Sequence, residues 1–236
     1  MTGTAKNIGG RAPRIGSNDI VRAGRALGMR ALSVKAVAAE LGVTAAALYR
    51  HVDGRWGLER LIGESILGDL ALRDDPALGV EAHLLSFAMQ LREFLLAHPG
   101  LALYLQILFP RGDAGRRVLT DEVKALARRG YSTEAAIVLS GAVASLSIAM
   151  AASEEHSEAA EYEDAGGLGR EREAAIAGIV VDDHLGAAHL ALPQMQRGDY
   201  VRLVLTGAIR GLLLAAPPGR PVAEIIADLS STQKEL

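Results

Sequence analysis

The stretch 33–55, SVKAVAAELGVTAAALYRHVDGR, decides how the chain folds. Its first part carries four apolar residues at helical spacing, which make one face of a short helix: Val34, Val37, Ala38 and Leu41. Ser33 can cap the start of this helix, and Gly42 can adopt the left-handed conformation that ends it. Thr44 can cap a second helix directly afterwards. This order predicts a helix-turn-helix, whose second helix enters the major groove of DNA.

The same stretch also resembles a known family. Residues 37–55, VAAELGVTAAALYRHVDGR, follow the pattern LAxxLGVxxxxLYxHVxxK, which is typical of the TetR family of transcriptional regulators. Arg55 stands where that family usually has Lys, and five characteristic residues match position by position: Val43, Leu48, Tyr49, His51 and Val52. The likeness is good over residues 16–70. The rest of the chain is similar only as a weakly patterned helical domain.

The resemblance implies an all-α protein in two functional parts. Residues 1–16 are basic and rich in glycine, so we expect a flexible arm that either touches DNA or is simply solvated. Residues 17–72 are expected to form the DNA-binding head, with a three-helix helix-turn-helix and a linking helix. Residues 73–236 are expected to form a larger helical body that binds an effector and dimerises.

Composition supports helices without relying on the resemblance. Half of the 236 residues are hydrophobic, only 4% are aromatic, and no strand-like alternation appears. The absence of cysteine excludes disulfides and thiolate metal sites and is consistent with the cytoplasm. No segment resembles a signal peptide, and the apolar run 135–152 is interrupted by serine and glycine. We therefore expect this run to be a buried or interfacial helix and expect no membrane partner.

Charge is divided unevenly along the chain. The net charge is −3, yet residues 1–60 carry ten Lys and Arg against four Asp and Glu, a net charge of +6. The remaining residues carry fifteen Lys and Arg against twenty-four Asp and Glu, a net charge of −9. A basic head on an acidic body fits neutralisation of DNA phosphates at one end of the chain.

The resemblance also implies which residues contact double-stranded operator DNA. Base contacts are expected from the start of the second helix and from the first helix: Val34, Lys35, Thr44, Ala45 and Ala46. Phosphate contacts are expected from Tyr49, His51 and Arg55, with Arg50 beside them on the solvent side. The alternatives are a half-buried aromatic for Tyr49 and a capping or core histidine for His51. Most base-contacting candidates are small, so methyl contacts or DNA shape would contribute to specificity.

Periodicity, glycine and proline predict the remaining elements. Helices are expected over 18–27, 56–72, 80–97, 101–109, 116–129, a helix from Thr133 that includes 135–152, 199–214 and 222–229. The acidic, glycine-rich segment 154–172 is expected to be a mobile loop.

Dimerisation and ligand binding are assigned to the body. The helices 135–152 and 200–214 are too apolar for one-sided surface helices, and GlyxxxGly spacing permits close approach. The predicted interface of a homodimer is Ser140, Val143, Ser147, Gly207, Ala208 and Gly211. The family resemblance implies a small-molecule pocket as well, with candidate wall residues His83, Phe87, Gln90, Tyr104, Gln106 and Met150. Each of these could equally be ordinary packing.

The best functional hypothesis is a ligand-responsive transcriptional regulator, most often a repressor released from a palindromic operator by a small molecule. A DNA-binding dimer without an effector is the alternative, and an enclosed apolar cavity would favour the first. A helical enzyme is unsupported because no convergent catalytic set is present. No metal or cofactor is expected, since His184 and His189 lie about 140° apart around a helix.

Overall fold

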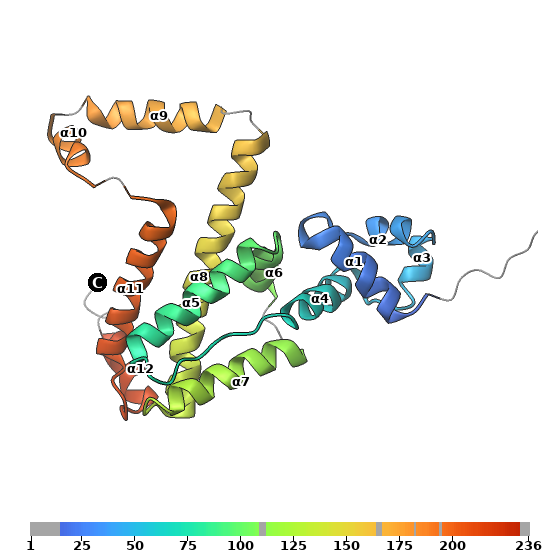
Figure 1. Ribbon diagram of the computed structural model, residues 1–236, viewed down its shortest axis with the longest axis horizontal. Coiled ribbons are helices and arrows are strands. Elements are labelled where there is room, and N and C mark those ends of the chain that lie inside the picture. The colour runs from blue at the N-terminus through green and yellow to red at the C-terminus, as the bar shows by residue number, and fades with distance from the viewer. Residues whose placement is uncertain (1–14, 109–111, 164–166, 182, 194, 232–236) are drawn as a thin grey trace, which may run out of the picture. The chain divides into compact units, whose positions relative to one another are not determined.

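The computed structural model describes residues 15–108, 112–163, 167–181, 183–193 and 195–231, and the arm residues 1–14 lie outside this range. Helices account for most of the described residues, and none of these residues lies in a strand, which confirms the all-α prediction (Figure 1). The chain divides into two compact units, Met1–Ile62 and Gly63–Leu236. The division falls inside α4 (Gly54–Leu67), whereas the sequence predicted a boundary after Leu72.

The N-terminal unit contains α1 (Ser17–Ala31), α2 (Val34–Glu40), α3 (Ala45–Leu48) and the first part of α4. The caps fall where the sequence predicts them. Ser33 Oγ accepts from the Ala36 amide at 3.0 Å, and Thr44 Oγ1 accepts from the Ala47 amide at 3.2 Å. Gly42 has φ of +64°, which turns the chain between α2 and α3.

Close packing in this unit depends on a glycine. A Cβ placed on Gly24 of α1 would lie 2.5 Å from Ile62 Cδ1, so only glycine lets α1 approach α4 this closely. Gly28, predicted to end the first helix, has φ of +72° and interrupts α1 with a kink. The core of the unit is built from side chains with no more than 1% exposure: Ile20, Val37, Leu48, Leu58 and Ile62.

The C-terminal unit is a helical body built around one long helix. Its helices are α5 (Val80–Leu96), α6 (Leu101–Ile107), α7 (Asp113–Ala127), α8 (Thr133–Glu163), α9 (Gly167–Val180), α10 (Asp183–Leu190), α11 (Arg197–Ala215) and α12 (Val222–Ser231). α8 packs against α5, α6, α7 and α11 (Figure 1). By length and composition, residues 133–160 of α8 could cross a membrane, but these contacts are those of the central helix of a body.

The predicted loop over 154–172 is wrong for most of its length. α8 continues to Glu163 and α9 begins at Gly167, while residues 164–166 lie outside the described range. The prediction rested on the acidity and glycine content of the segment, but glutamate and alanine, which make up much of it, are strong helix formers. Two of its acids are also bound: Glu154 accepts from Arg92 Nε at 2.8 Å, and Glu155 accepts from the Gly100 amide at 2.7 Å.

The linking helix is shorter at its C-terminal end than predicted. α4 ends at Leu67, and residues 68–75 form an irregular segment, which we call the strap, where helix was expected to Leu72. Arg117 of α7 explains the ending, because its guanidinium donates to the backbone carbonyls of Leu67, Gly68 and Leu70 at 3.1–3.3 Å. These carbonyls would otherwise accept from the next helical turn.

Candidate nucleic-acid interface and ligand cavity

The proposed DNA-contacting residues are mostly accessible on the helix-turn-helix. Tyr49 is 56% exposed, and Lys35, Thr44, Ala46, Arg50 and His51 are also exposed, while Ala45 is half-buried. Val34 is the exception, because its side chain is only 9% exposed and packs in the core of the unit. The prediction of a base contact by Val34 is therefore corrected.

Arg55 carries existing partners that a phosphate would have to replace. Its Nε lies 2.6 Å from Glu59 Oε1, and its guanidinium sits 5.1 Å from the ring centroid of Trp56. Both Arg55 and Trp56 are exposed. The Arg55 side chain is 72% exposed although that of Glu59 is only 12% exposed, so water screens the pair at the arginine and a DNA phosphate can compete for it.

The body contains an apolar cavity of about 140 Å³. Its walls come from α5, α6, α7 and α8 and from the end of α4, and the strap contributes Leu70. Most of the lining side chains are aliphatic or aromatic, and Glu122 of α7 is the only ionisable residue among them. Its side chain is 5% exposed.

A buried hydrogen-bonded chain leads from Glu122 to the strap. Glu122 Oε1 lies 2.9 Å from His83 Nε2, and His83 Nδ1 lies 3.0 Å from Asp74 Oδ1. Burial would raise the pKa of Asp74, but hydrogen bonds from Arg129 and Arg128 outweigh burial and lower it from 3.8 to about 2. Asp74 is therefore ionised at neutral pH.

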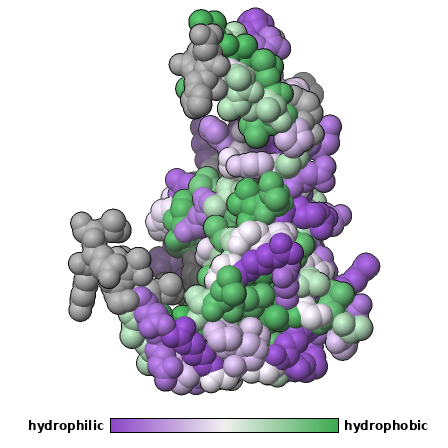
Figure 2. All heavy atoms as spheres, turned by 90° about the vertical axis from the view of Figure 1, so that its left-hand side faces the viewer, coloured by the Kyte–Doolittle hydropathy of each residue, from purple (hydrophilic) through white to green (hydrophobic). Residues whose placement is uncertain are grey.

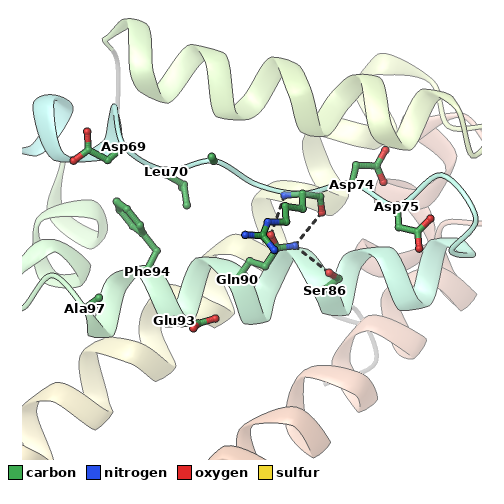
Figure 3. Close-up of a pocket in the computed structure, with 11 residues that line it drawn as sticks. Asp69, Leu70, Asp74, Asp75, Ser86, Gln90, Glu93, Phe94 and Ala97 are labelled. Atoms are coloured by element: carbon green, nitrogen blue, oxygen red, sulfur yellow. Dashed lines mark hydrogen bonds between the residues drawn. The ribbon is translucent and has the colours of Figure 1, made fainter.

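The strap is held along its length by side chains of the body. Gln90 of α5 accepts from the Arg73 amide at 2.9 Å and donates to the Arg73 carbonyl at 3.0 Å (Figure 3). Arg129 of α7 donates to the carbonyls of Asp75 and Leu78. An open groove of about 640 Å³ lies between the strap and α5. Its lining, shown in Figure 3, holds four acids, Asp69, Asp74, Asp75 and Glu93, against one base, Arg73.

The C-terminal part of α4 is also tied to the body. Glu64 accepts from the amides of Gly112 and Gly115, at 2.9 and 3.3 Å, and so caps the start of α7. A Cβ on Gly63 would lie 2.4 Å from the Tyr104 ring, so α4 packs directly on α6. Leu67, the last residue of α4, lines the cavity. A molecule in the cavity would therefore touch the helix that continues into the N-terminal unit.

The predicted pocket residues occupy different places. Phe87 lines the cavity, whereas Gln90 lines the groove and holds the strap. His83 is buried behind Glu122, and Tyr104 packs on Gly63, so neither lines the cavity. Gln106 is exposed, and Met150 is half-buried outside the cavity lining, which corrects their assignment.

Half of the predicted dimer residues are corrected by burial. Ser140, Val143 and Ser147 are at most 2% exposed within the single chain, so they cannot meet a second copy. Ser147 Oγ instead donates to the Ala88 carbonyl of α5 at 2.7 Å, and Ser140 lines the cavity. Ala208 is half-buried, while Gly207 and Gly211 are exposed and a Cβ at either would meet open space.

A different set of residues on α8 and α11 is exposed and apolar. On α11, Tyr200, Leu203 and Leu214 recur at helical spacing with Gly207 and Gly211, so they share one stripe of that helix, the α11 stripe. On α8, Ile137, Val138 and Leu146 are also exposed, but Ile137 and Leu146 are nine positions apart and lie on opposite sides of the helix. Figure 2 looks at the side that carries α10, α11 and α12, and hydrophobic residues gather there in patches between charged ones.

Sequence reasoning missed Glu122, although a signal for it exists. Gly115, Val118, Glu122 and Leu126 recur at helical spacing on the apolar side of α7, so a carboxylate interrupts an otherwise apolar stripe. A charged residue on a buried stripe needs a partner, and this requirement points to an internal histidine or to a ligand. Among the described residues, no group of His, Asp and Glu is arranged to hold a metal ion.

Comparison with known proteins identifies the fold. No protein-family model and no curated protein matches the sequence. Among solved structures, the TetR family protein ActR from Streptomyces coelicolor, in complex with actinorhodin, is 24% identical, with a TM-score of 0.71 over 88% of this chain and 99% of that chain. A possible TetR family regulator from Streptomyces coelicolor A3(2) is 22% identical, with a TM-score of 0.66 over 84% and 98%.

A more distant structure shares the same architecture. A TetR variant from Acinetobacter baumannii AYE, in complex with minocycline, is 18% identical, with a TM-score of 0.55 over 82% of this chain and 93% of that chain. Each of these matches spans nearly the whole length of the other protein. The chain therefore has the fold of TetR family regulators, in its helix-turn-helix unit and in its helical body.

Proposed function

We propose that this protein is a ligand-responsive, DNA-binding transcriptional regulator of the TetR family that acts in the cytoplasm as a homodimer. In this proposal it represses transcription from a near-palindromic operator until a small molecule releases it. The observation that carries the proposal is the shared helix α4, which begins in the helix-turn-helix unit and ends at Leu67 in the wall of an apolar cavity. The cavity is partly open instead of enclosed, and it is the apolar lining that supports this function over a dimer without an effector.

The DNA-binding part of the proposal rests on the exposed residues of the helix-turn-helix. A dimer reads two successive major grooves when its recognition helices lie roughly 34–36 Å apart. Tyr49 and His51 are expected to contact phosphates, which orient the protein without reading sequence. Lys35, Thr44 and Ala46 are the exposed candidates for base contacts.

The test of DNA binding starts with selection of operator sequences from random duplexes by the purified protein. Tyr49→Phe and His51→Ala should then weaken binding to operator and to random DNA alike, measured by filter binding over a salt series. Tyr162→Phe is the matched control, because Tyr162 is 91% exposed on α8 and should not affect DNA binding. Unchanged operator affinity in both head variants would refute the assignment.

The dimer part of the proposal rests on the exposed apolar α11 stripe. Gly207 is exposed on α11 and a Cβ there meets nothing within 4 Å, so Gly207→Leu should leave the single chain folded while forcing two copies apart. Sedimentation should show monomers that no longer bind operator. Gly178→Leu, at a similarly open position of α9, is the control. A Gly207→Leu dimer of wild-type stability would place the interface elsewhere.

Release by a ligand is proposed to act through α4 and the strap. Suppose that the ligand binds best to a body whose α4 helices hold the two DNA-binding heads at the wrong spacing for the operator. DNA must then lower the affinity for the ligand by the same factor by which the ligand lowers the affinity for DNA, typically about 5- to 150-fold. Calorimetry with and without operator measures this factor. Equal ligand affinities in the two titrations would refute coupling, whatever the effect of the ligand in cells.

A further inference from the structure

The cavity has one polar feature that its apolar walls do not explain. Glu122 is almost fully buried, and its Oε1 is bound to His83. Among the described residues, none donates to the second oxygen, Oε2. In the part of the chain that the structure describes, no fully buried side-chain nitrogen or oxygen lacks a hydrogen-bond partner, so Oε2 keeps some accessible surface, which a donor can reach.

The protons of the buried chain determine what this oxygen can do. Asp74 is held ionised by two arginines, so His83 Nδ1 must donate to it. His83 Nε2 and Glu122 Oε1 then share one proton at 2.9 Å, either as imidazolium with carboxylate or as imidazole with carboxylic acid. In both arrangements that proton lies between Nε2 and Oε1. Glu122 Oε2 is therefore a hydrogen-bond acceptor in either case.

The other polar groups of the cavity do not supply a donor. Ser140 Oγ donates to the Ile137 carbonyl at 3.3 Å, and Ser145 Oγ donates to the Gly141 carbonyl at 2.8 Å. Both hydroxyl hydrogens are thus committed to the backbone of α8. Among the residues that line the cavity, none carries a positive charge. The wall accepts hydrogen bonds and offers none for an anion.

The volume limits the size of the occupant. About 140 Å³ is close to the roughly 150 Å³ of an engineered apolar cavity that binds benzene. A single ring with a short polar substituent fits this space without rearrangement of the helices.

We propose that the cavity binds a compact apolar molecule with one hydrogen-bond donor, an amine or a hydroxyl, which docks on Glu122 Oε2, and that it excludes carboxylates of the same size. This inference rests on the proposed function only in treating the cavity as the effector site. The donor satisfies the free oxygen, while the rest of the molecule contacts aliphatic and aromatic side chains. A carboxylate would place two acceptors together and bury a second charge without a partner.

The test compares four probes of similar size by calorimetry on the full chain without DNA: benzylamine, benzyl alcohol, toluene and benzoate. Benzylamine and benzyl alcohol should bind about 10- to 100-fold more tightly than toluene, as expected for a hydrogen bond to a buried carboxyl group. Benzoate should not bind measurably. Equal affinities across the series, benzoate binding as tightly as benzylamine, or no binding by any probe would each overturn the inference.

A variant tests the role of the carboxyl group. Glu122→Leu removes both carboxyl oxygens without adding a hydrogen-bond donor, so benzylamine and benzyl alcohol should lose their advantage over toluene. Glu93→Gln is the control, because Glu93 lines the open groove instead of the cavity and should change neither. A benzylamine affinity that is unchanged in Glu122→Leu would contradict the proposal. The four-probe ranking of the wild-type chain stands as a test even if this variant does not fold.

The outcomes also separate this inference from the proposed function. If benzylamine binds as expected but never alters operator binding, the ligand chemistry is correct and ligand-responsive regulation is wrong. If the operator is bound and none of the probes enters the cavity, DNA binding stands and the ligand chemistry is wrong.

Discussion

Removing the Glu64 carboxylate should loosen the attachment of α4 to the body. In the structure, this one side chain serves as the N-terminal cap of α7, because Gly112 at the cap position has no side chain of its own. Glu64→Ala leaves the amides of Gly112 and Gly115 without these acceptors. It also removes a negative charge from the positive end of the α7 dipole.

The expected loss of stability follows from the lengths of the two hydrogen bonds that Glu64 accepts. The bond at 2.9 Å is a full charge-assisted hydrogen bond, and the one at 3.3 Å is weak. One strong and one weak bond in a half-buried setting should cost about 2 to 3 kcal/mol, which corresponds to a fall in Tm of roughly 5 to 10 °C for a chain of this size. Scanning calorimetry at one fixed protein concentration measures it, because the Tm of a dimer depends on concentration.

A double-mutant cycle makes the test specific. A Cβ on Gly112 would lie 2.4 Å from the carboxyl carbon of Glu64, so Gly112→Ala should push the carboxylate away and cost nearly as much as Glu64→Ala. In the Glu64→Ala background the same change should be almost neutral. Glu81→Ala is the control, since its pair with Arg210 is exposed and worth at most about 1 kcal/mol. Additive effects of Glu64→Ala and Gly112→Ala, or a loss below about 0.5 kcal/mol for Glu64→Ala, would refute the reasoning.

Three further substitutions test other contacts. Asp74→Asn should lower the free energy of unfolding by about 2 kcal/mol at pH 7, because the pKa of Asp74 is lowered to about 2 in the folded chain. This stabilisation is complete above pH 3.8 and is lost as the pH falls through about 2. Urea titrations of the variant and the wild type should therefore converge at low pH. Ser147→Ala should lower the free energy of unfolding by about 1 kcal/mol, since it removes the bond to the Ala88 carbonyl, and an unchanged urea midpoint would contradict that value. Gly63→Ala should cost about 1 to 3 kcal/mol by pressing a methyl group into the Tyr104 ring, and wild-type thermal stability would show that the ring moves freely.

The sequence predicted the helix-turn-helix well because its signals are local. Ser33, Thr44 and Gly42 act within a few residues of themselves, so cap and turn chemistry could be read directly from the chain. The helix over 80–97 was also predicted almost to the residue, because Gly79 and the run His98-Pro99-Gly100 bound a clear apolar period.

The sequence was less informative wherever a distant residue decides the outcome. The strap was predicted as helix because nothing near Gly68 reveals that Arg117, forty-nine positions away, takes its carbonyl. Ser147 was assigned to the dimer interface because a small polar residue in an apolar helix suits either a close approach of two chains or an internal hydrogen bond. Only the position of the Ala88 carbonyl separates these readings. The cavity has no local signature at all, since it is the space left where several helices meet.

Leu70 gives the protein a simple way to change the size of what it recognises. This one side chain borders the apolar cavity, the groove beside α5 and a third hollow of about 280 Å³ beside α7. The Leu70 side chain therefore separates the cavity, the groove and the third hollow from one another. A longer side chain at this position would keep them apart, and a shorter one would join them. Because Leu70 belongs to the strap, where no regular backbone hydrogen bonding has to be preserved, substitution there can widen the range of acceptable ligands without rebuilding the helices.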